Sequence, residues 1–190
     1  MRLLKELLYH KAYDLINNKY KKDMMDNIVV DYVILDFSNN NYNKEYSHKE
    51  AVIEAIKVLN IRNKINNFTI DIDNMECYKY SSEELFELPK SKYYKDKVFN
   101  GNCRYRKIYK SPPYWYAFLE PAYPNSFTIK DFNVLNDILF PFKGCIEIYR
   151  WNDDFSSYFD YGKEWWGTLC ISVYDFKSNV FTVILASDTD

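Results

Sequence analysis

The side chains that most often carry catalysis are scarce in this chain and form no known catalytic pattern. It has two histidines, His10 and His48, and four glycines among 190 residues. His48 lies inside Ser47-His-Lys-Glu50, which has the pattern of a helix capping box, so we expect a solvated residue at a helix start. The glycine-rich phosphate loops, the H-E-x-x-H zinc motif and the G-x-S-x-G hydrolase motif are absent from the sequence. The sequence therefore predicts no catalytic residue, no metal site and no cofactor.

One arrangement of carboxylates would fit a metal-dependent nuclease. Such enzymes hold a divalent cation with carboxylates on neighbouring strands, and a nearby lysine offsets the charge of the attacked phosphate. Asp175-Phe-Lys177 has a suitable spacing, with Asp160 or Glu164 upstream. The same segment, from Asp175 to Asn179, is rich in turn residues and lies where a hairpin must turn. We therefore expect a turn here and keep the nuclease, using these carboxylates and Lys177, as the alternative function.

Carboxylates and aromatic rings are concentrated in the segment from Asn152 to Glu164. It contains four of each and has no sustained apolar period, so we expect an exposed loop between two strands. Carboxylates steer a basic partner, and tyrosine rings give contact area at low entropic cost. Of the adjacent tryptophans that follow, Trp165 is expected to face the core, because neighbouring strand residues face opposite sides. Trp166 then either belongs to the contact surface or packs under the N-terminal helix. The predicted partner-binding residues are Asp153, Asp154, Tyr158, Asp160, Tyr161, Glu164 and Trp166.

The overall charge argues against binding to nucleic acid or to an anionic membrane over the whole surface, because the formal net charge is −2. A basic stretch from Lys90 to Lys110 carries eight basic residues against one acidic residue, with aromatic residues among them. Such a mixture can stack on bases and contact phosphates. The acidic charge of the whole chain favours a solvated face instead, and the sequence leaves open whether this stretch has a ligand.

Cysteine usage and hydropathy point to the cytoplasm. Four cysteines, Cys77, Cys103, Cys145 and Cys170, lie far apart with no C-x-x-C pair, which favours reduced thiols. The first eight residues place charges where a secretion signal would need an apolar core, and no apolar run is long enough to span a membrane. We expect one cytoplasmic domain over residues 1–190, and the sequence does not determine its oligomeric state.

The N-terminal part, about residues 1–62, is predicted to be helical. Apolar residues recur at helical spacing from Arg2 to Asn17. Met24 to Phe37 fits either a helix or a strand, and we favour the helix. A further helix should start at the capping box and end near Asn60 or Arg62. Phe68 to Ile72 is expected to form a short strand, and Ser82 to Leu88 one or two helical turns.

The C-terminal part, about residues 103–190, is predicted to supply a sheet. Tyr114 to Leu119 is a strand candidate, and a helix capped by Thr128 should run until Pro141 stops it. Three strands follow, at Cys145–Trp151, Trp165–Tyr174 and Val180–Ala186. The order favours an α+β fold in which N-terminal helices pack on a mainly antiparallel C-terminal sheet.

The pairing of the last two strands can be predicted from their apolar faces. Joining the odd-numbered apolar residues of both strands sets Val173 opposite Phe181 and Ile171 opposite Val183. The connection is then a three-residue loop over residues 176–178.

Several stretches of the C-terminal half resemble a known group of proteins. Tyr114-Trp-Tyr-Ala-Phe-Leu-Glu-Pro121, Pro124-Asn-Ser-Phe-Thr128, Asp153 to Gly167 and Ala186-Ser-Asp-Thr-Asp190 look like small uncharacterised proteins of low-G+C Gram-positive bacteria. Some of these resemble immunity proteins encoded beside polymorphic toxins. The resemblance implies a compact, cytoplasmic, non-enzymatic protein that binds a toxin domain, in many cases a basic nuclease, through an acidic and aromatic surface.

Overall fold

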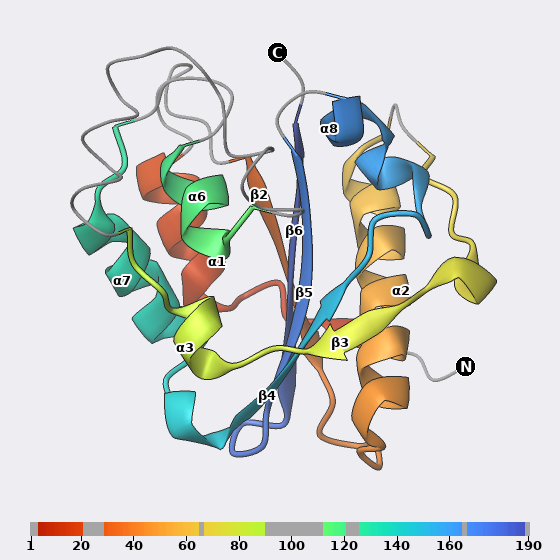
Figure 1. Cartoon of the computed structure of the whole chain (residues 1–190). Helices are drawn as coiled ribbons and strands as arrows, with labels where there is room; N and C mark the ends of the chain where they lie inside the picture. Colours follow the sequence, from red (N-terminus) through yellow and green to blue (C-terminus); the bar gives the residue numbers. More distant parts are fainter. Residues whose placement is uncertain are drawn as a thin grey trace.

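The chain folds into one six-stranded sheet with helices on both faces (Figure 1). The structure is a computed structural model, and it describes residues 4–20, 29–64, 67–89, 112–120, 126–164 and 167–188. The strand order is β1-β2-β6-β5-β4-β3, and every neighbouring pair is antiparallel. The predicted α+β fold with an antiparallel sheet is therefore confirmed.

The strands are β1 (Lys5–Glu6), β2 (Val30–Asp36), β3 (Cys77–Lys79), β4 (Ile146–Trp151), β5 (Gly167–Asp175) and β6 (Val180–Asp188). The α-helices are α1 (Lys11–Leu15), α2 (Lys44–Arg62), α3 (Ser82–Leu85), α6 (Tyr114–Leu119), α7 (Ile129–Leu139) and α8 (Asp160–Glu164). A π-helical turn, η1 (Ile16–Tyr20), continues α1, and the short 3₁₀ turns are η2 (Ile72–Asn74), η3 (Lys143–Cys145) and η4 (Ser157–Phe159).

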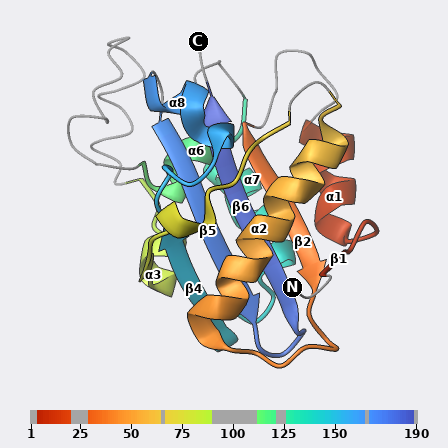
Figure 2. The same ribbon diagram turned by 90° about the vertical axis from the view of Figure 1, so that its right-hand side faces the viewer.

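The central strands are buried on both faces, because helices cover the sheet on each side. Helix α2 lies along one face, and α1, α6 and α7 cover the other (Figures 1 and 2). All nine residues of β5 are buried. Apolar side chains therefore alternate between two cores, which explains the nearly continuous apolar composition of these strands.

The hairpin register differs from the predicted one by one residue. Val173 pairs with Thr182, and Tyr174 pairs with Phe181. Phe181 lies in the core under α2, whereas Val173 faces the core under α6 and α7. Because both faces of these strands are buried, hydrophobic alternation does not fix the register in the way it does for a sheet with one solvated face.

The turn between β5 and β6 fixes the register instead. It contains four residues, Phe176–Asn179, rather than three, and Asp175 pairs directly with Val180. The Asp175 side chain accepts hydrogen bonds from the amides of Lys177 at 2.8 Å and Ser178 at 3.3 Å. Asn179 takes a positive φ of 53°, a conformation that asparagine tolerates better than most residues. The expectation of a turn from Asp175 to Asn179 is thus confirmed.

Two predicted elements have the wrong secondary structure. Residues 30–36 form a strand between β1 and β6 rather than a helix, in keeping with their β-branched content. Residues 114–119 form α6 rather than a strand, with Pro113 at the N-cap and all six residues buried. Short, largely apolar runs have no periodicity that separates a buried helix from a buried strand.

The helix boundaries also differ from the sequence prediction at the N-terminal side. The helix expected from residue 2 begins at Lys11, because Lys5–Glu6 pairs with the end of β2 and His10 caps α1. Helix α2 begins at Lys44, one turn before the predicted capping box, and Ser47 accepts from the amide of Asn43 instead. It ends at Arg62 as predicted.

The remaining short elements agree with the prediction except near residue 70. Helix α7 starts with the expected cap, in which Thr128 and Asp131 exchange side-chain and backbone hydrogen bonds. Helix α3 forms within the predicted stretch, with a capping box between Ser81 and Glu84. In place of the strand expected over 68–72, Ile70 forms a single bridge with Ser156. None of the described helices combines the length and the apolar composition needed to cross a membrane.

Candidate functional site

The acidic segment, defined as residues 152–164, is held in place by its aromatic residues. Phe155 and Phe159 are fully buried in the core under α2. The Ser156 hydroxyl donates to the carbonyl of Thr69 at 2.7 Å, and the amide of Gly162 donates to the Ser187 hydroxyl at 3.1 Å. The segment expected to be an exposed loop is thus an ordered connection through η4 and α8 that packs against the ends of β5 and β6 (Figure 1).

Three of the predicted binding residues face solvent. The side chains of Asp154 and Asp160 are 74% and 63% exposed, and Tyr161 is 68% exposed. The Lys163 ammonium lies 3.0 Å from the Asp154 carboxylate and 3.8 Å from that of Asp160. One lysine therefore balances two carboxylates, and this surface keeps an excess of negative charge.

The other predicted residues have different positions. Asp153 accepts a hydrogen bond of 2.6 Å from the Thr168 hydroxyl, which ties it to the start of β5. Tyr158 is buried, and its hydroxyl donates to the Asp31 carboxylate at 2.8 Å. Glu164 is the last residue of α8, and Trp166, like Trp165, lies outside the described residues.

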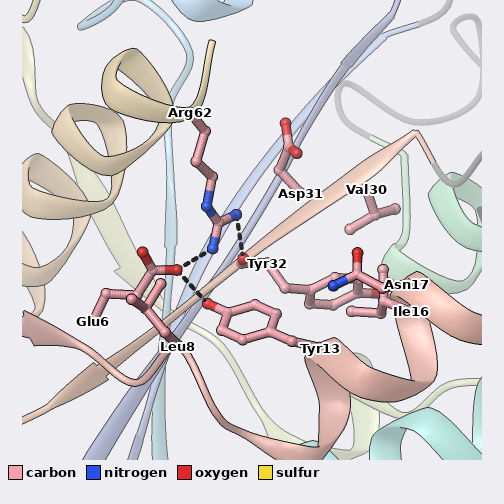
Figure 3. Close-up of a pocket in the computed structure, with 9 residues that line it drawn as sticks. All are labelled: Glu6, Leu8, Tyr13, Ile16, Asn17, Val30, Asp31, Tyr32 and Arg62. Atoms are coloured by element: carbon pink, nitrogen blue, oxygen red, sulfur yellow. Dashed lines mark hydrogen bonds and ion pairs between the residues drawn. The ribbon is translucent and has the colours of Figure 1, made fainter.

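Asp31 connects the acidic segment to a neighbouring pocket of about 410 Å³ (Figure 3). The pocket lies beside β2 beyond the end of β1, which pairs only with Leu35 and Asp36. Its walls come from β2, from the N-terminal residues through η1, and from the end of α2. The lining residues are Glu6, Leu8, Tyr13, Ile16, Asn17, Val30, Asp31, Tyr32 and Arg62.

Side chains of the pocket form hydrogen bonds with the backbone groups at the open edge of β2. The Arg62 guanidinium donates to the carbonyl of Tyr32 at 3.1 Å and to the Glu6 carboxylate, and it lies 5.1 Å from the centre of the Tyr13 ring. The Tyr13 hydroxyl donates to Glu6 at 2.9 Å (Figure 3). It also accepts from the amide of Ile34 at 2.8 Å. These contacts occupy backbone groups that would otherwise offer an edge to another strand.

Two carboxylates, those of Glu6 and Asp31, and the guanidinium of Arg62 are the charged groups among the described lining residues. Burial by itself would lower the pKa of Arg62, but the electrostatic and hydrogen-bond interactions with Tyr13 and Glu6 have a larger effect and raise it. Arg62 therefore stays charged. Burial also raises the pKa of Tyr13, which stays a neutral hydrogen-bond donor. Arg62 already pairs with Glu6, and Asp31 adds a second carboxylate at the wall. A cationic group fits this lining better than an anion does.

His48 is buried rather than solvated, which corrects the sequence prediction. It is 0% exposed, with Nδ1 2.8 Å from the Ser172 hydroxyl and Nε2 3.1 Å from the Tyr42 hydroxyl. Burial lowers the pKa of His48 to about 3, so the ring is neutral near pH 7. Because Ser172 is also 0% exposed, no substrate reaches this serine–histidine pair, and its geometry joins α2 to the sheet.

The residues of the nuclease alternative do not converge in the described structure. Asp175 is 4% exposed and caps the β5–β6 turn, whereas the Lys177 ammonium lies over the Phe142 ring at 4.8 Å from its centre. Among the residues that the structure describes, no three His, Cys, Asp or Glu side chains are grouped to hold a metal ion. The basic stretch of residues 90–110 and Cys103 lie outside the described residues, and Cys77, Cys145 and Cys170 are free thiols.

Comparisons of the chain with protein-family models, with curated proteins and with solved structures give no match.

Proposed function

We propose that this chain is a non-catalytic binding protein whose acidic segment binds a basic protein partner. The partner is a toxin domain of the kind that immunity proteins neutralise. The observation that carries the proposal is the pair of exposed carboxylates, Asp154 and Asp160, on a backbone anchored by buried rings. The resemblance of the C-terminal stretches to immunity-like proteins supports the same partner class. The free cysteines fit a reducing compartment, so we place the complex in the cytoplasm.

The anchoring of the acidic segment favours tight binding. Ordering a loop on association costs free energy, and a segment already held by Phe155, Phe159 and Ser156 avoids much of that cost. The exposed Tyr161 adds aromatic contact area beside the two carboxylates. Excess negative charge then speeds the encounter with a basic surface.

The neighbouring pocket gives this surface a specific anchor point. With a volume of about 410 Å³, it has room for one lysine or arginine side chain of the partner. Asp31 lies in its wall, and the hydroxyl of Tyr158, a buried residue of the acidic segment, donates a hydrogen bond to the Asp31 carboxylate. This hydrogen bond orients the carboxylate before a partner binds. We infer that the partner inserts one basic side chain here while its surrounding surface contacts α8.

The deciding experiment uses the gene immediately upstream of this one. The proposal expects that gene to encode a large secreted toxin, whose C-terminal domain should co-purify with this chain when the two are expressed together. Titration calorimetry at about 50 and 300 mM NaCl should give a Kd that rises with salt, because exposed charges are screened. A toxin domain that fails to bind, or binds with no dependence on salt, would overturn the proposal.

A further inference from the structure

A second cavity lies at the opposite end of the sheet from the acidic segment. It has a volume of about 190 Å³ and lies between the end of α7 and the β5–β6 hairpin. Buried apolar side chains, including Leu139, Phe140 and Val173, form most of its wall, while Pro141 and Ser178 are exposed at its mouth. Strand β6 begins at Val180, which lines this cavity, whereas α8 of the acidic segment packs at the other end of the strand. A ligand in this cavity is therefore independent of the proposed function.

Asp175 lines this cavity, and one oxygen of its carboxylate is buried without a hydrogen-bond partner among the described residues. Asp175 is 4% exposed, and its Oδ1 accepts from the turn amides of Lys177 and Ser178. Its Oδ2 is buried and has no hydrogen-bond partner among the described residues. Since Oδ1 is occupied by the turn, Oδ2 is the carboxylate oxygen left to accept a hydrogen bond from a molecule that enters the cavity. A buried acceptor without a donor is costly, so this position favours a ligand that supplies one.

The end of α7 strengthens the preference for a positive ligand. Its last residue, Leu139, lines the cavity, and the C-terminal end of a helix carries a partial negative charge. The last turn of α7 contains no basic residue to balance it. Lys177 does not serve either, because its ammonium lies 4.8 Å from the centre of the Phe142 ring.

The remaining polar lining accommodates a cation. Thr182 and Ser178 contribute hydroxyl groups that can accept hydrogen bonds. His10 lies at the cavity and accepts from the amide of Ala12 through Nδ1 at 3.3 Å. Burial and the nearby charge of Lys11 lower the pKa of His10, so its ring is uncharged near pH 7 and does not repel a cation.

We propose that this cavity binds a primary alkylammonium group, with the nitrogen at Asp175 Oδ2 and the carbon chain along Phe140, Val173 and Val180. The volume of about 190 Å³ equals that of roughly six water molecules, so a chain of about four carbons with its nitrogen fits. Two sources share this chemistry: a free small amine and the lysine side chain of a protein.

The first experiment compares n-butylammonium chloride with 1-butanol on the whole chain by NMR titration. The ammonium should bind with a millimolar Kd and shift the amide signals of the 175–180 turn, and 1-butanol should bind at least about tenfold more weakly. In Asp175→Asn, which keeps Oδ1 for the turn amides, the ammonium affinity should fall by about tenfold or more. Asp73→Asn, an exposed aspartate elsewhere, is the matched control and should bind as the wild type does.

The second experiment separates the two sources. A blocked lysine, N-acetyl-lysine methylamide, is titrated in parallel with n-butylammonium. Stronger binding of the blocked lysine identifies a protein side chain as the ligand, whereas binding of the free amine alone identifies a small molecule. Equal binding of n-butylammonium and 1-butanol to the wild type, or undiminished binding to a folded Asp175→Asn variant, would overturn the proposal.

Discussion

His48 Nδ1 and Ser172 Oγ lie 2.8 Å apart at a contact between α2 and β5 where both residues are 0% exposed. The indole of Trp151 donates to the same hydroxyl at 2.8 Å. The Tyr42 hydroxyl donates to the Glu147 carboxylate, so it can only accept from His48. The proton of the neutral imidazole then resides on Nε2, which faces the Tyr42 hydroxyl at 3.1 Å. In this chain of hydrogen bonds, every donor has an acceptor only while His48 is uncharged.

Acid should therefore destabilise the fold through His48. Its pKa is about 3 in the folded chain because of burial, compared with 6.5 when unperturbed. Below about pH 6.5 the unfolded chain binds a proton that the folded chain does not. Stability is unaffected by this group above that pH and should fall by about 1.4 kcal/mol per pH unit between about pH 6 and pH 3. Urea unfolding at a series of pH values measures this slope.

The variant His48→Gln isolates the contribution of the histidine. It retains every carboxylate of the wild type, so their shared contribution to the pH dependence cancels in the comparison. The variant should be less stable at pH 7, by about 1–3 kcal/mol, but it should lose less stability on acidification. Parallel stability curves for the two proteins would show that His48 is not held neutral by burial.

Tyr42 extends this buried chain of hydrogen bonds to the surface. Its hydroxyl donates to the Glu147 carboxylate, which also accepts from the Lys79 ammonium at 2.8 Å. Tyr42→Phe should cost about 1–2 kcal/mol of unfolding free energy, because it leaves the His48 proton without an acceptor. Tyr78→Phe removes a hydroxyl from a 54% exposed ring and should change stability by less than about 0.5 kcal/mol. Equal effects in the two variants would contradict this role of Tyr42.

Secondary structure was predicted correctly from the sequence where apolar residues follow one face of an element or where a helix cap is present. Helix α7 follows from the Thr128 cap and its apolar stripe, and the three C-terminal strands follow from their length and composition. The prediction was wrong for residues 30–36 and 114–119, whose apolar side chains are buried on all sides. In such segments the environment decides between helix and strand, and hydrophobic periodicity does not distinguish the two.

The site was predictable in part for a similar reason. The sequence identified the charged segment that contains the exposed Asp154, Asp160 and Tyr161. It missed the pocket, because Glu6, Asp31 and Arg62 are far apart in the chain and meet only through sheet pairing and the length of α2. It also misassigned His48, since the capping pattern around this residue is not the start of α2.

The proposed binding surface predicts a specific effect of charge removal. The double variant Asp154→Asn and Asp160→Asn should raise the Kd for the toxin domain by about tenfold or more and flatten its salt dependence. Its thermal midpoint should stay nearly unchanged, because the exposed pairs with Lys163 contribute little to stability.

The control for this variant is Asp73→Asn, which removes an exposed aspartate in η2. It should leave the affinity unchanged within about twofold, since its charge lies outside the acidic segment. An equal loss of affinity in the control would indicate a general charge effect rather than a defined surface. Unchanged affinity in the double variant would place the partner elsewhere.

The chain should not cleave DNA or RNA in the presence of Mg²⁺. Asp175 is enclosed beside the β5–β6 turn, and the Lys177 ammonium is directed to the Phe142 ring, so the two do not form a phosphate-binding pair. The measurement is cleavage of labelled single- and double-stranded substrates with and without EDTA. Metal-dependent cleavage that disappears in both Asp175→Asn and Lys177→Ala would establish the nuclease instead.

Arg62 should hold the N-terminal segment against the open edge of β2. Its guanidinium joins the Tyr32 carbonyl to the Glu6 carboxylate, and 36% of its side chain remains exposed. A lysine offers a single charged nitrogen and cannot span both groups in the same plane. Arg62→Lys should therefore cost about 1 kcal/mol of unfolding free energy, and Arg62→Ala about 1–3 kcal/mol.

Hydrogen exchange locates this effect within the fold. The amide of Leu7 donates to the carbonyl of Ile34 at 2.8 Å, just beyond the β1–β2 pair. In Arg62→Ala this amide should exchange faster relative to the amides of β5, because the segment opens without unfolding the central strands. Lys64→Ala, an exposed basic residue two positions later, should leave both the exchange rates and the stability unchanged. A uniform increase of exchange across the sheet would instead mean that Arg62 stabilises the fold as a whole and has no local role at the edge of β2.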